Sequence, residues 1–210
     1  WFRQAAEQEG RIAINLIGDA FSDALRQQAI DCIRQQLGQV DLVVYSLASG
    51  LRVLPDGRQV RSVLKTTGQP FSGWGLDLEQ DALVQQSLSP ATPEEIRDTV
   101  TVMGGEDWQL WMQALQQADC LAPGVQTVAY SYIGPESTYP LYRDGTIGYA
   151  KEHLHATAET INLQLAELGG HAWVSVCKAL VTKASAYIPV LPVYLGLLMG
   201  VMKERGVHEG

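Results

Sequence analysis

Tyr142 and Lys151 form a pair whose side chains could do acid–base chemistry together. A tyrosine hydroxyl can hydrogen-bond an oxygen that gains negative charge and donate a proton to it, and a nearby ammonium favours release of that proton. The two residues are nine positions apart, so one continuous helix, at about 100° per residue, would place them on opposite faces. Tyr142 must therefore lie ahead of the helix that carries Lys151, with Gly145 and Gly148 permitting the bend.

This spacing does not identify a site without further evidence. Tyr194 and Lys203 are also nine positions apart, but they lie in an apolar run, where we expect a structural role. Trp108 and Trp111 are expected to pack within the protein rather than to stack on a substrate.

The cysteines and histidines predict no metal site. Cys32, Cys120 and Cys177 are widely separated and fit no metal or redox spacing, which is typical of reduced thiols in a cytoplasmic protein. His153 and His155 are two positions apart, and on a helix that spacing points them to different faces. We expect both to lie on a solvated helix surface.

The composition is typical of a soluble globular protein. Of the 210 residues, 46% are hydrophobic and 18% are charged, and the net charge of -8 argues against nucleic acid as a partner. The apolar run from Tyr187 to Met202 is shorter than the ~20 residues that a spanning helix needs, and Pro189 and Pro192 interrupt its start. We therefore expect a buried helix or a lid over an apolar pocket, with no stable insertion into a membrane.

The first part of the chain predicts a strand–helix–strand unit. Its segments are a strand at Ile12–Ile17, a helix at Ala24–Leu37 capped by Ser22 or Asp23 and stopped by Gly38, and a strand at Val40–Ser46. The last of these contains an unbroken apolar run, which favours a strand buried on both faces of a parallel sheet.

The alternation of strands and helices is interrupted after residue 50 and resumes after residue 93. Residues 51–93 contain the turn Pro55-Asp56-Gly57 and glycine-rich polar segments, which indicate an inserted small hairpin segment. Further on we expect helices from Pro93, capped by Thr92, and from Glu106 to Gln117, a strand at Val125–Tyr132, a helix at Gly148–Leu168 and a strand at Ala172–Val176. The sequence predicts an α/β fold with a Rossmann-like, doubly wound parallel sheet and extra helices.

A glycine-rich phosphate loop, which a dinucleotide-binding fold carries between its first strand and first helix, is absent from the sequence. The first predicted strand leads instead into Gly18-Asp19-Ala20-Phe21. Asp19 is typical of a residue at the end of a later strand, facing the adenine side of a cofactor. We expect the chain to begin after the phosphate-binding half of such a fold.

Six segments in order resemble one enzyme family. They are GDAFSD (18–23), QVDLVVYSLAS (39–49), VMGGEDW (102–108), YSYIGPE (130–136), GTIGYAKEHL (145–154) and VMKERGVHEG (201–210). Together they resemble the FabV-type enoyl-acyl-carrier-protein reductases and the related trans-2-enoyl-CoA reductases, with Gly50 in place of a proline that is usual there. The resemblance implies that residues 1–210 are the central and C-terminal part of a single reductase domain, with an insertion at about 51–93.

The resemblance also implies the site residues. The family's tyrosine and lysine, separated by eight residues, match Tyr142 and Lys151, and Tyr132 would contact the substrate. The residues implied to bind the cofactor are Asp19, Ala20, Leu47 and Ala48 on the adenine and ribose side, Lys151 at the nicotinamide ribose, and Leu180, Val181 and Thr182 at the nicotinamide end.

The implied function is NADH-dependent reduction of the trans-2 double bond of enoyl thioesters, carried by acyl carrier protein or coenzyme A, in fatty-acid synthesis. The expected protein is a cytoplasmic monomer with no metal. Two alternatives stay open at this point. The fold could serve as a non-catalytic nucleotide-binding interaction module, which an intact Tyr142–Lys151 pair opposes. The run 187–202 could anchor the protein to a membrane, which its two prolines oppose.

Overall fold

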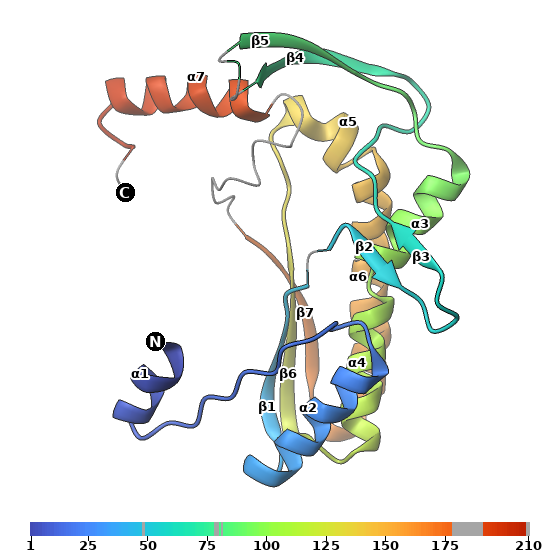
Figure 1. The fold of residues 1–210 in the computed structure, drawn as a ribbon, viewed down its shortest axis with the longest axis vertical. Coiled ribbons are helices and arrows are strands. Elements are labelled where there is room, and N and C mark those ends of the chain that lie inside the picture. The colour runs from blue at the N-terminus through green and yellow to red at the C-terminus, as the bar shows by residue number, and fades with distance from the viewer. Residues whose placement is uncertain (48, 78–79, 81, 178–190, 209–210) are drawn as a thin grey trace.

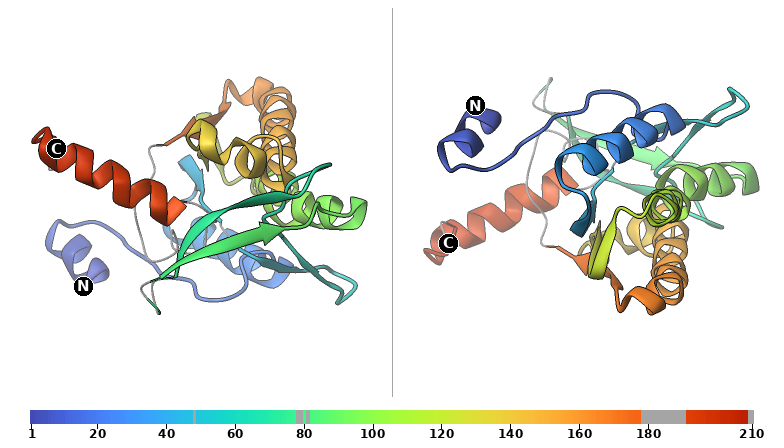
Figure 2. Two further views of the ribbon diagram at one scale, coloured as in Figure 1. Left: turned by 90° about the horizontal axis from the view of Figure 1, so that it is seen from above. Right: turned by 90° about the horizontal axis from the view of Figure 1, so that it is seen from below.

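A computed structural model describes residues 1–47, 49–77, 80, 82–177 and 191–208. Its centre is a parallel three-stranded sheet with strand order β1-β6-β7, formed by Val40–Tyr45, Leu121–Ser131 and His171–Val176 (Figure 1). Helices α2 (Asp23–Gln36), α4 (Glu106–Gln117) and α6 (Thr146–Leu165) pack against one face of the sheet (Figure 2). The predicted α/β class with a Rossmann-like parallel sheet is confirmed.

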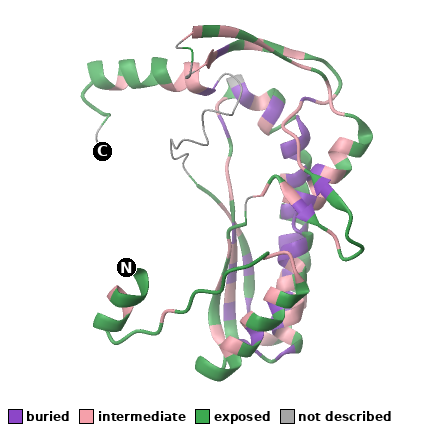
Figure 3. Cartoon of the chain, in the orientation of Figure 1, coloured by how far each residue is buried: buried purple, intermediate pink, exposed green. Residues whose placement is uncertain are grey.

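The main core lies between these helices and the sheet. Its buried apolar side chains come from the three helices, β6 and β7 and include Trp108, Met112, Val125, Ile161 and Leu165, while β1 adds partly buried side chains. Burial is concentrated along α6, whereas the outer helices α1 (Phe2–Gln8) and α7 (Leu191–Glu204) are largely exposed (Figure 3).

The prediction that the strand at 40–46 is buried on both faces is wrong for the described residues. Val43 and Tyr45 pack on the core, but Leu42 is 56% exposed and Val44 is 46% exposed. Alternate residues of a strand point to opposite faces, and the helices α2, α4 and α6 cover only one of them. An unbroken apolar run therefore does not report how many faces of this strand are covered.

The predicted strand at Ile12–Ile17 is also wrong. This segment forms no strand, and Ile12 and Ile17 are 62% and 95% exposed. A strand needs a neighbour whose backbone groups it can pair with, and none of the strands in the described part of the chain pairs with residues 12–17.

The segment 51–93 forms two antiparallel hairpins. Strands β2 (Leu51–Val53) and β3 (Gln59–Arg61) flank the predicted turn, in which Gly57 adopts φ +83° and its N–H donates to the Leu54 carbonyl at 2.9 Å. Strands β4 (Phe71–Asp77) and β5 (Ala82–Leu88) form the second hairpin, and β4 contacts α7 (Figure 1). The predicted hairpin turn is confirmed.

Helix α7 bears on the expectation of a buried helix or a lid over an apolar pocket, and its residues, among them Leu195 and Leu198, line an apolar pocket as the second alternative predicts. Of its residues only Leu191 is buried, and Leu197 is 69% exposed, so it is not a buried helix; residues 187–190 lie outside the described part. Among the described residues, no helix is long and apolar enough to cross a membrane.

Local capping explains where several helices begin. The Ser22 hydroxyl accepts a hydrogen bond from the Leu25 N–H at the start of α2. Thr92 and Glu95 form a reciprocal capping box at the start of α3 (Pro93–Met103). Both caps satisfy N–H groups that the first helical turn leaves unpaired, as the sequence predicts.

The chain turns sharply between α5 (Tyr139–Tyr142) and α6, as the spacing of Tyr142 and Lys151 requires. Gly145 has extended backbone angles (φ -97°, ψ -168°) and is the N-cap of α6. A side chain at Gly145 would meet the Lys65 carbonyl oxygen at 2.5 Å, and one at Gly148 would meet the Arg143 carbonyl oxygen at 1.8 Å. These glycines therefore let the two segments approach each other closely.

We expect Gly148→Ala to destabilise the protein, because its methyl group would overlap the Arg143 carbonyl oxygen and α6 would have to shift. Overpacking of this kind costs about 1–3 kcal/mol of unfolding free energy. Urea unfolding measures it. The control is Gly200→Ala on α7, where the added carbon meets nothing within 4 Å, so the helix should gain up to about 1 kcal/mol. Equal stability of Gly148→Ala and the parent would contradict this account of the turn.

Candidate functional site

Tyr142, Lys151 and Tyr132 come together as the sequence predicts. The rings of Tyr132 and Tyr142 meet edge to face, with centroids 5.7 Å apart. The Lys151 Nζ lies 5.0 Å from the Tyr142 ring centroid and 5.6 Å from that of Tyr132. The same ammonium donates a hydrogen bond to the Tyr132 backbone carbonyl. The lysine is thus fixed against both tyrosines.

Three neighbouring elements supply these residues. Tyr132 follows the carboxyl end of the central strand β6, Tyr142 ends the short helix α5, and Lys151 lies in the second turn of α6. In open α/β sheets, ligands bind outside the carboxyl ends of parallel strands. The trio therefore stands at the edge of the sheet where this fold class places its ligands.

Two adjoining cavities border the trio. Tyr142 and Lys151 line a cavity of about 160 Å³ together with Ser131 and His155. Tyr132 lines a larger one, of about 960 Å³, whose wall is mostly apolar and comes from α7 and the end of β7. Ile133 and Gly134 line both cavities, so the two are neighbours.

Burial lowers the pKa of Lys151 from 10.5 to about 8. The cause is desolvation, which disfavours the charged form of an ammonium. Lys151 is therefore protonated at neutral pH but loses its charge at a much lower pH than an exposed lysine.

Burial has the opposite effect on the tyrosines. The pKa of Tyr142 is raised, first by burial and then by the nearby Tyr132, and the pKa of Tyr132 is raised first by burial and then by Tyr194. The sequence led us to expect that the ammonium would ease proton release from the tyrosine, but the structure gives the other direction, because both burial and the neighbouring Tyr132 raise the pKa of Tyr142. Tyr142 stays protonated and can act as an O–H donor.

The predicted adenine-side residues also line one cavity. Asp19, Ala20 and Leu47 surround a space of about 310 Å³ beside Phe21 and Ser49. The exposed carboxylate of Asp19 accepts a hydrogen bond from the Phe21 N–H through Oδ1, at 3.0 Å. Leu47 follows the carboxyl end of β1, the strand next to β6, so this cavity opens at the same edge of the sheet as the trio.

Four of the predicted residues cannot be placed. Ala48, Leu180, Val181 and Thr182 lie outside the described residues. The cavity of Asp19, Ala20 and Leu47 shares no lining residue with those of Tyr132, Tyr142 and Lys151, so the structure divides the placed residues into two separate groups.

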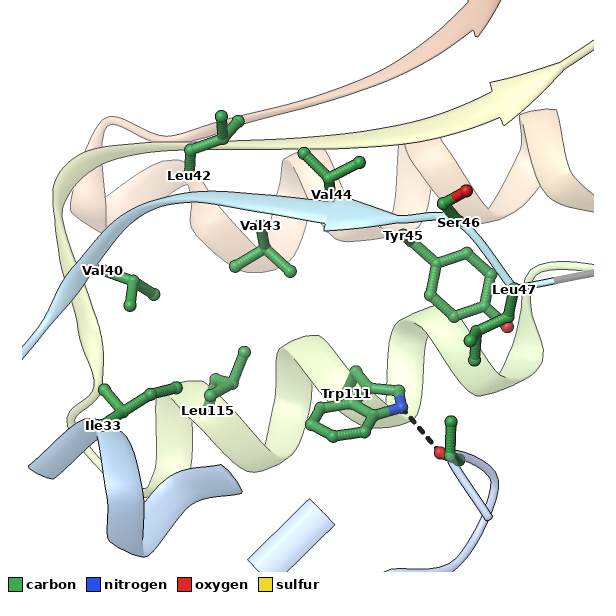
Figure 4. Close-up of a pocket in the computed structure, with 11 residues that line it drawn as sticks. Ile33, Val40, Leu42, Val43, Val44, Tyr45, Ser46, Leu47, Trp111 and Leu115 are labelled. Carbon is green, nitrogen blue, oxygen red and sulfur yellow. Dashed lines mark hydrogen bonds between the residues drawn. The ribbon is translucent and has the colours of Figure 1, made fainter. Parts of the chain in front are cut away.

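The sequence did not predict that Trp111 would contact the loop at Ala20. Both tryptophans pack within the protein, as expected: Trp108 is fully buried, and Trp111 is half-buried in an apolar groove of about 380 Å³ between β1, α2 and α4. In addition, the Trp111 indole N–H donates to the Ala20 carbonyl at 3.1 Å (Figure 4). Tyr194, expected to be structural, lines the large cavity beside Tyr132. Only the tertiary structure reveals either contact.

His153 is exposed on α6. Its Nδ1 accepts a hydrogen bond from the Gly105 N–H at 3.0 Å, and this bond joins α6 to the start of α4. Within the described ranges, no group of three or more histidine, cysteine or acidic side chains could hold a metal ion.

Known proteins of one family are similar to the whole of this chain. The family model described as the trans-2-enoyl-CoA reductase catalytic region matches residues 1–210. Similar proteins include enoyl-[acyl-carrier-protein] reductase [NADH] 2 of Photobacterium profundum, 53% identical, and enoyl-[acyl-carrier-protein] reductase [NADH] 1 of Vibrio cholerae, 51% identical. All of this chain is covered in both comparisons, against 53% and 52% of those proteins.

A solved structure is also similar to this chain in fold and sequence. The trans-2-enoyl-CoA reductase of Treponema denticola, determined in complex with NAD, matches with a TM-score of 0.91 and 50% identity, over 100% of this chain and 52% of that one. The chain thus spans about half the length of these relatives. The resemblance seen in the sequence is confirmed, and the chain belongs to the family of trans-2-enoyl-CoA reductase catalytic regions.

Proposed function

We propose that this chain carries the catalytic residues of an NADH-dependent reductase that saturates the trans-2 double bond of enoyl thioesters in fatty-acid synthesis. The observation that carries the proposal is the Lys151 ammonium 5.0 Å from the Tyr142 ring, at the carboxyl edge of the parallel sheet. The names of the relatives, which specify enoyl-acyl-carrier-protein and NADH, support the reaction and the cofactor.

The residues present fit such a cofactor. The adenine-side cavity of Asp19, Ala20 and Leu47 and the ammonium of Lys151 lie at the carboxyl ends of adjacent strands. We propose that Asp19, Ala20, Leu47 and Ala48 contact the adenine and ribose, and that Lys151 binds the nicotinamide ribose hydroxyls. Leu180, Val181 and Thr182 would complete the nicotinamide end.

NADH, when bound, would supply a hydride to the β-carbon of the enoyl thioester. The electron pair of the double bond would then move onto the thioester oxygen as an enolate. Tyr142, which burial keeps protonated, donates a hydrogen bond and then its proton to that oxygen; the enol tautomerises to the saturated thioester, and Tyr142 regains a proton from solvent. A donor placed in advance where charge develops is worth ~2.7–4 kcal/mol of transition-state stabilisation. Lys151 contributes positive charge at the same place and holds Tyr132 through its backbone carbonyl.

The large cavity beside Tyr132 suits the acyl chain. Its lining is mostly apolar and includes Leu195, Leu198 and Met199 of α7. Tyr132 stands where the thioester end would meet Tyr142, which supports its role as a substrate contact. The carrier of the acyl group is acyl carrier protein or coenzyme A.

The wider assignments are also proposals. We propose a cytoplasmic, monomeric enzyme with no nucleic-acid partner, in which residues 1–210 form part of one Rossmann-like domain and the hairpins of residues 51–93 are an insertion. The pyrophosphate contacts would come from sequence outside residues 1–210. No observation favours the non-catalytic alternative.

The full-length protein should oxidise NADH when a trans-2-enoyl thioester is present, and should prefer NADH to NADPH. Steady-state kinetics with both cofactors, and with the coenzyme A and acyl-carrier-protein thioesters, measure this. No turnover with either thioester would contradict the proposed reaction, and a preference for NADPH would contradict the assigned cofactor.

Tyr142→Phe should lower kcat by ~10²–10³ with little change in KM, because it removes one donor to the developing oxyanion and keeps the ring. The matched control is Tyr149→Phe, since Tyr149 is exposed on the first turns of α6. Its kcat should stay within a few-fold of the parent. If the two substitutions have equal effects, Tyr142 is not the donor.

The kcat/KM for NADH should fall as pH rises through about 8, the pKa of Lys151, because the ammonium loses its charge there. The fold should not weaken over the same range. Unfolded Lys151 keeps its proton up to about 10.5, so between these pH values the unfolded state binds more protons and the free energy of unfolding rises with pH.

Lys151→Arg provides the control, because arginine stays charged throughout this range. Its remaining activity should lack the fall near pH 8. If the fall persists in Lys151→Arg at the same pH, a different group titrates.

A further inference from the structure

The segment Gly18–Ser22, here called the adenine-side loop, borders the cavity assigned above to the adenosine part of the cofactor. Its internal hydrogen bonds form one tight turn, in which the Ser22 N–H and hydroxyl both donate to the Asp19 carbonyl, at 3.0 and 2.7 Å. The segment before it, residues 12–17, forms no strand. Contacts from other elements must therefore set the position of the loop.

Trp111 provides such a contact. Its indole N–H, on α4, donates to the backbone carbonyl of Ala20 at 3.1 Å (Figure 4). Ala20 lines both the adenine-side cavity and the apolar groove that contains Trp111. This bond joins the middle of the loop to a core helix 91 positions away in the sequence.

Trp111 is itself held by a buried charged network. The guanidinium of Arg26, only 6% exposed, lies 5.4 Å from the centre of the Trp111 ring. Arg26 pairs with the buried Asp107 at 2.9 Å and also with Asp23, and Asp107 accepts a hydrogen bond from the Tyr45 hydroxyl at 3.2 Å. The indole therefore has little freedom to turn away from Ala20.

A second cation holds the other side of the loop. The guanidinium of Arg52 lies 5.4 Å from the centre of the Phe21 ring. Arg52 is buried and donates to the Thr101 carbonyl at 2.8 Å and to Glu106 at 2.5 Å. The Ala20 carbonyl is thus held from α4 and the Phe21 ring from β2, and the Asp19 carboxylate is tied to the same turn because it accepts a hydrogen bond from the Phe21 N–H.

We propose that Trp111 is a positioning residue for the adenosine part of the dinucleotide: its indole N–H holds the Ala20 carbonyl so that Asp19 and Ala20 face the ligand. The inference rests on the proposed NADH binding. It differs from a packing role because it depends on the N–H donor and not on the volume of the ring.

Trp111→Phe in the full-length protein separates these two roles, because phenylalanine keeps an aromatic ring against Arg26 but has no N–H. The Kd for ADP-ribose, which carries the adenosine but no nicotinamide, should rise about 3- to 10-fold, the usual range for one hydrogen bond. The KM for NADH should rise by a similar factor, and kcat at saturating NADH should stay within about 2-fold of the parent.

Trp173→Phe is the matched control. The Trp173 indole also donates a hydrogen bond, to Gln126 Oε1 at 2.8 Å, but it lies exposed on β7 and lines none of the cavities described above. Its ADP-ribose affinity should equal that of the parent. An unchanged Kd in Trp111→Phe, an equal loss in Trp173→Phe, or a fall in kcat that matches the rise in KM would each overturn the proposal.

A measurement on the unmodified full-length protein guards against misfolding of the variant. Hydrogen exchange at the Trp111 indole N–H should slow when ADP-ribose binds, because the ligand orders the loop that accepts its bond, while exchange at Trp173 should not change. Equal exchange at Trp111 with and without ADP-ribose would overturn the proposal. Binding of ADP-ribose with no reduction of an enoyl thioester would refute the proposed reaction and leave the positioning role standing.

Discussion

The approach of the Lys151 ammonium to the Tyr142 ring depends on one turn of the chain, at Gly145. A helix that ran on through 142–151 would point the two side chains in opposite directions. The extended backbone of Gly145 separates α5 from α6, and the carbonyls of Lys65 and Leu141 stand where a side chain at this position would be. The turn therefore requires glycine for steric reasons, although its φ is negative.

The packing that this turn creates also sets the electrostatics of the site. Bringing α5 down onto α6 and the end of β6 removes water from Lys151 and from both tyrosines. Desolvation disfavours charge on each group, so the lysine loses its proton more easily and the tyrosines hold theirs more tightly. Around neutral pH the result is a charged ammonium beside a protonated phenol, which is the combination that an oxygen gaining negative charge requires.

The parallel sheet brings the two groups of candidate site residues to the same edge. β1 and β6 are adjacent and parallel, so the residues that follow them reach the same edge of the sheet although they are distant in sequence. Arg26 of α2 pairs with the buried Asp107 of α4, and the buried Arg52 of β2 pairs with Glu106 of the same helix. Removing one partner of the buried pair Arg26–Asp107 would leave an uncompensated charge, so this pair holds Arg26 against Trp111 more strongly than an exposed pair could.

The sequence predicts helix starts and ends well, because these depend on contacts between residues a few positions apart. Ser22 and Thr92 cap helices because their hydroxyls reach N–H groups three residues away, and Gly169 ends α6 and the turn after it with a left-handed backbone. The Tyr142–Lys151 pair could be predicted because the bend is a consequence of their spacing, and the family resemblance singled it out from the equally spaced Tyr194–Lys203.

What could not be predicted depends on contacts between distant segments. The apolar residues 12–17 read as a strand, but a strand exists only with a partner. The run in β1 cannot report which of its faces a helix covers. The bond from Trp111 to Ala20 and the net direction of the Tyr142 pKa both arise from tertiary packing, which periodicity does not encode.

The most direct test of the central claim is a crystal structure of the full-length protein with NAD⁺ and a saturated acyl thioester. The account predicts the Tyr142 hydroxyl within about 3 Å of the thioester carbonyl oxygen, and the Lys151 Nζ at a similar distance from a nicotinamide ribose hydroxyl. A thioester oxygen bound by another donor, with the Tyr142 hydroxyl directed away from it, would contradict the account.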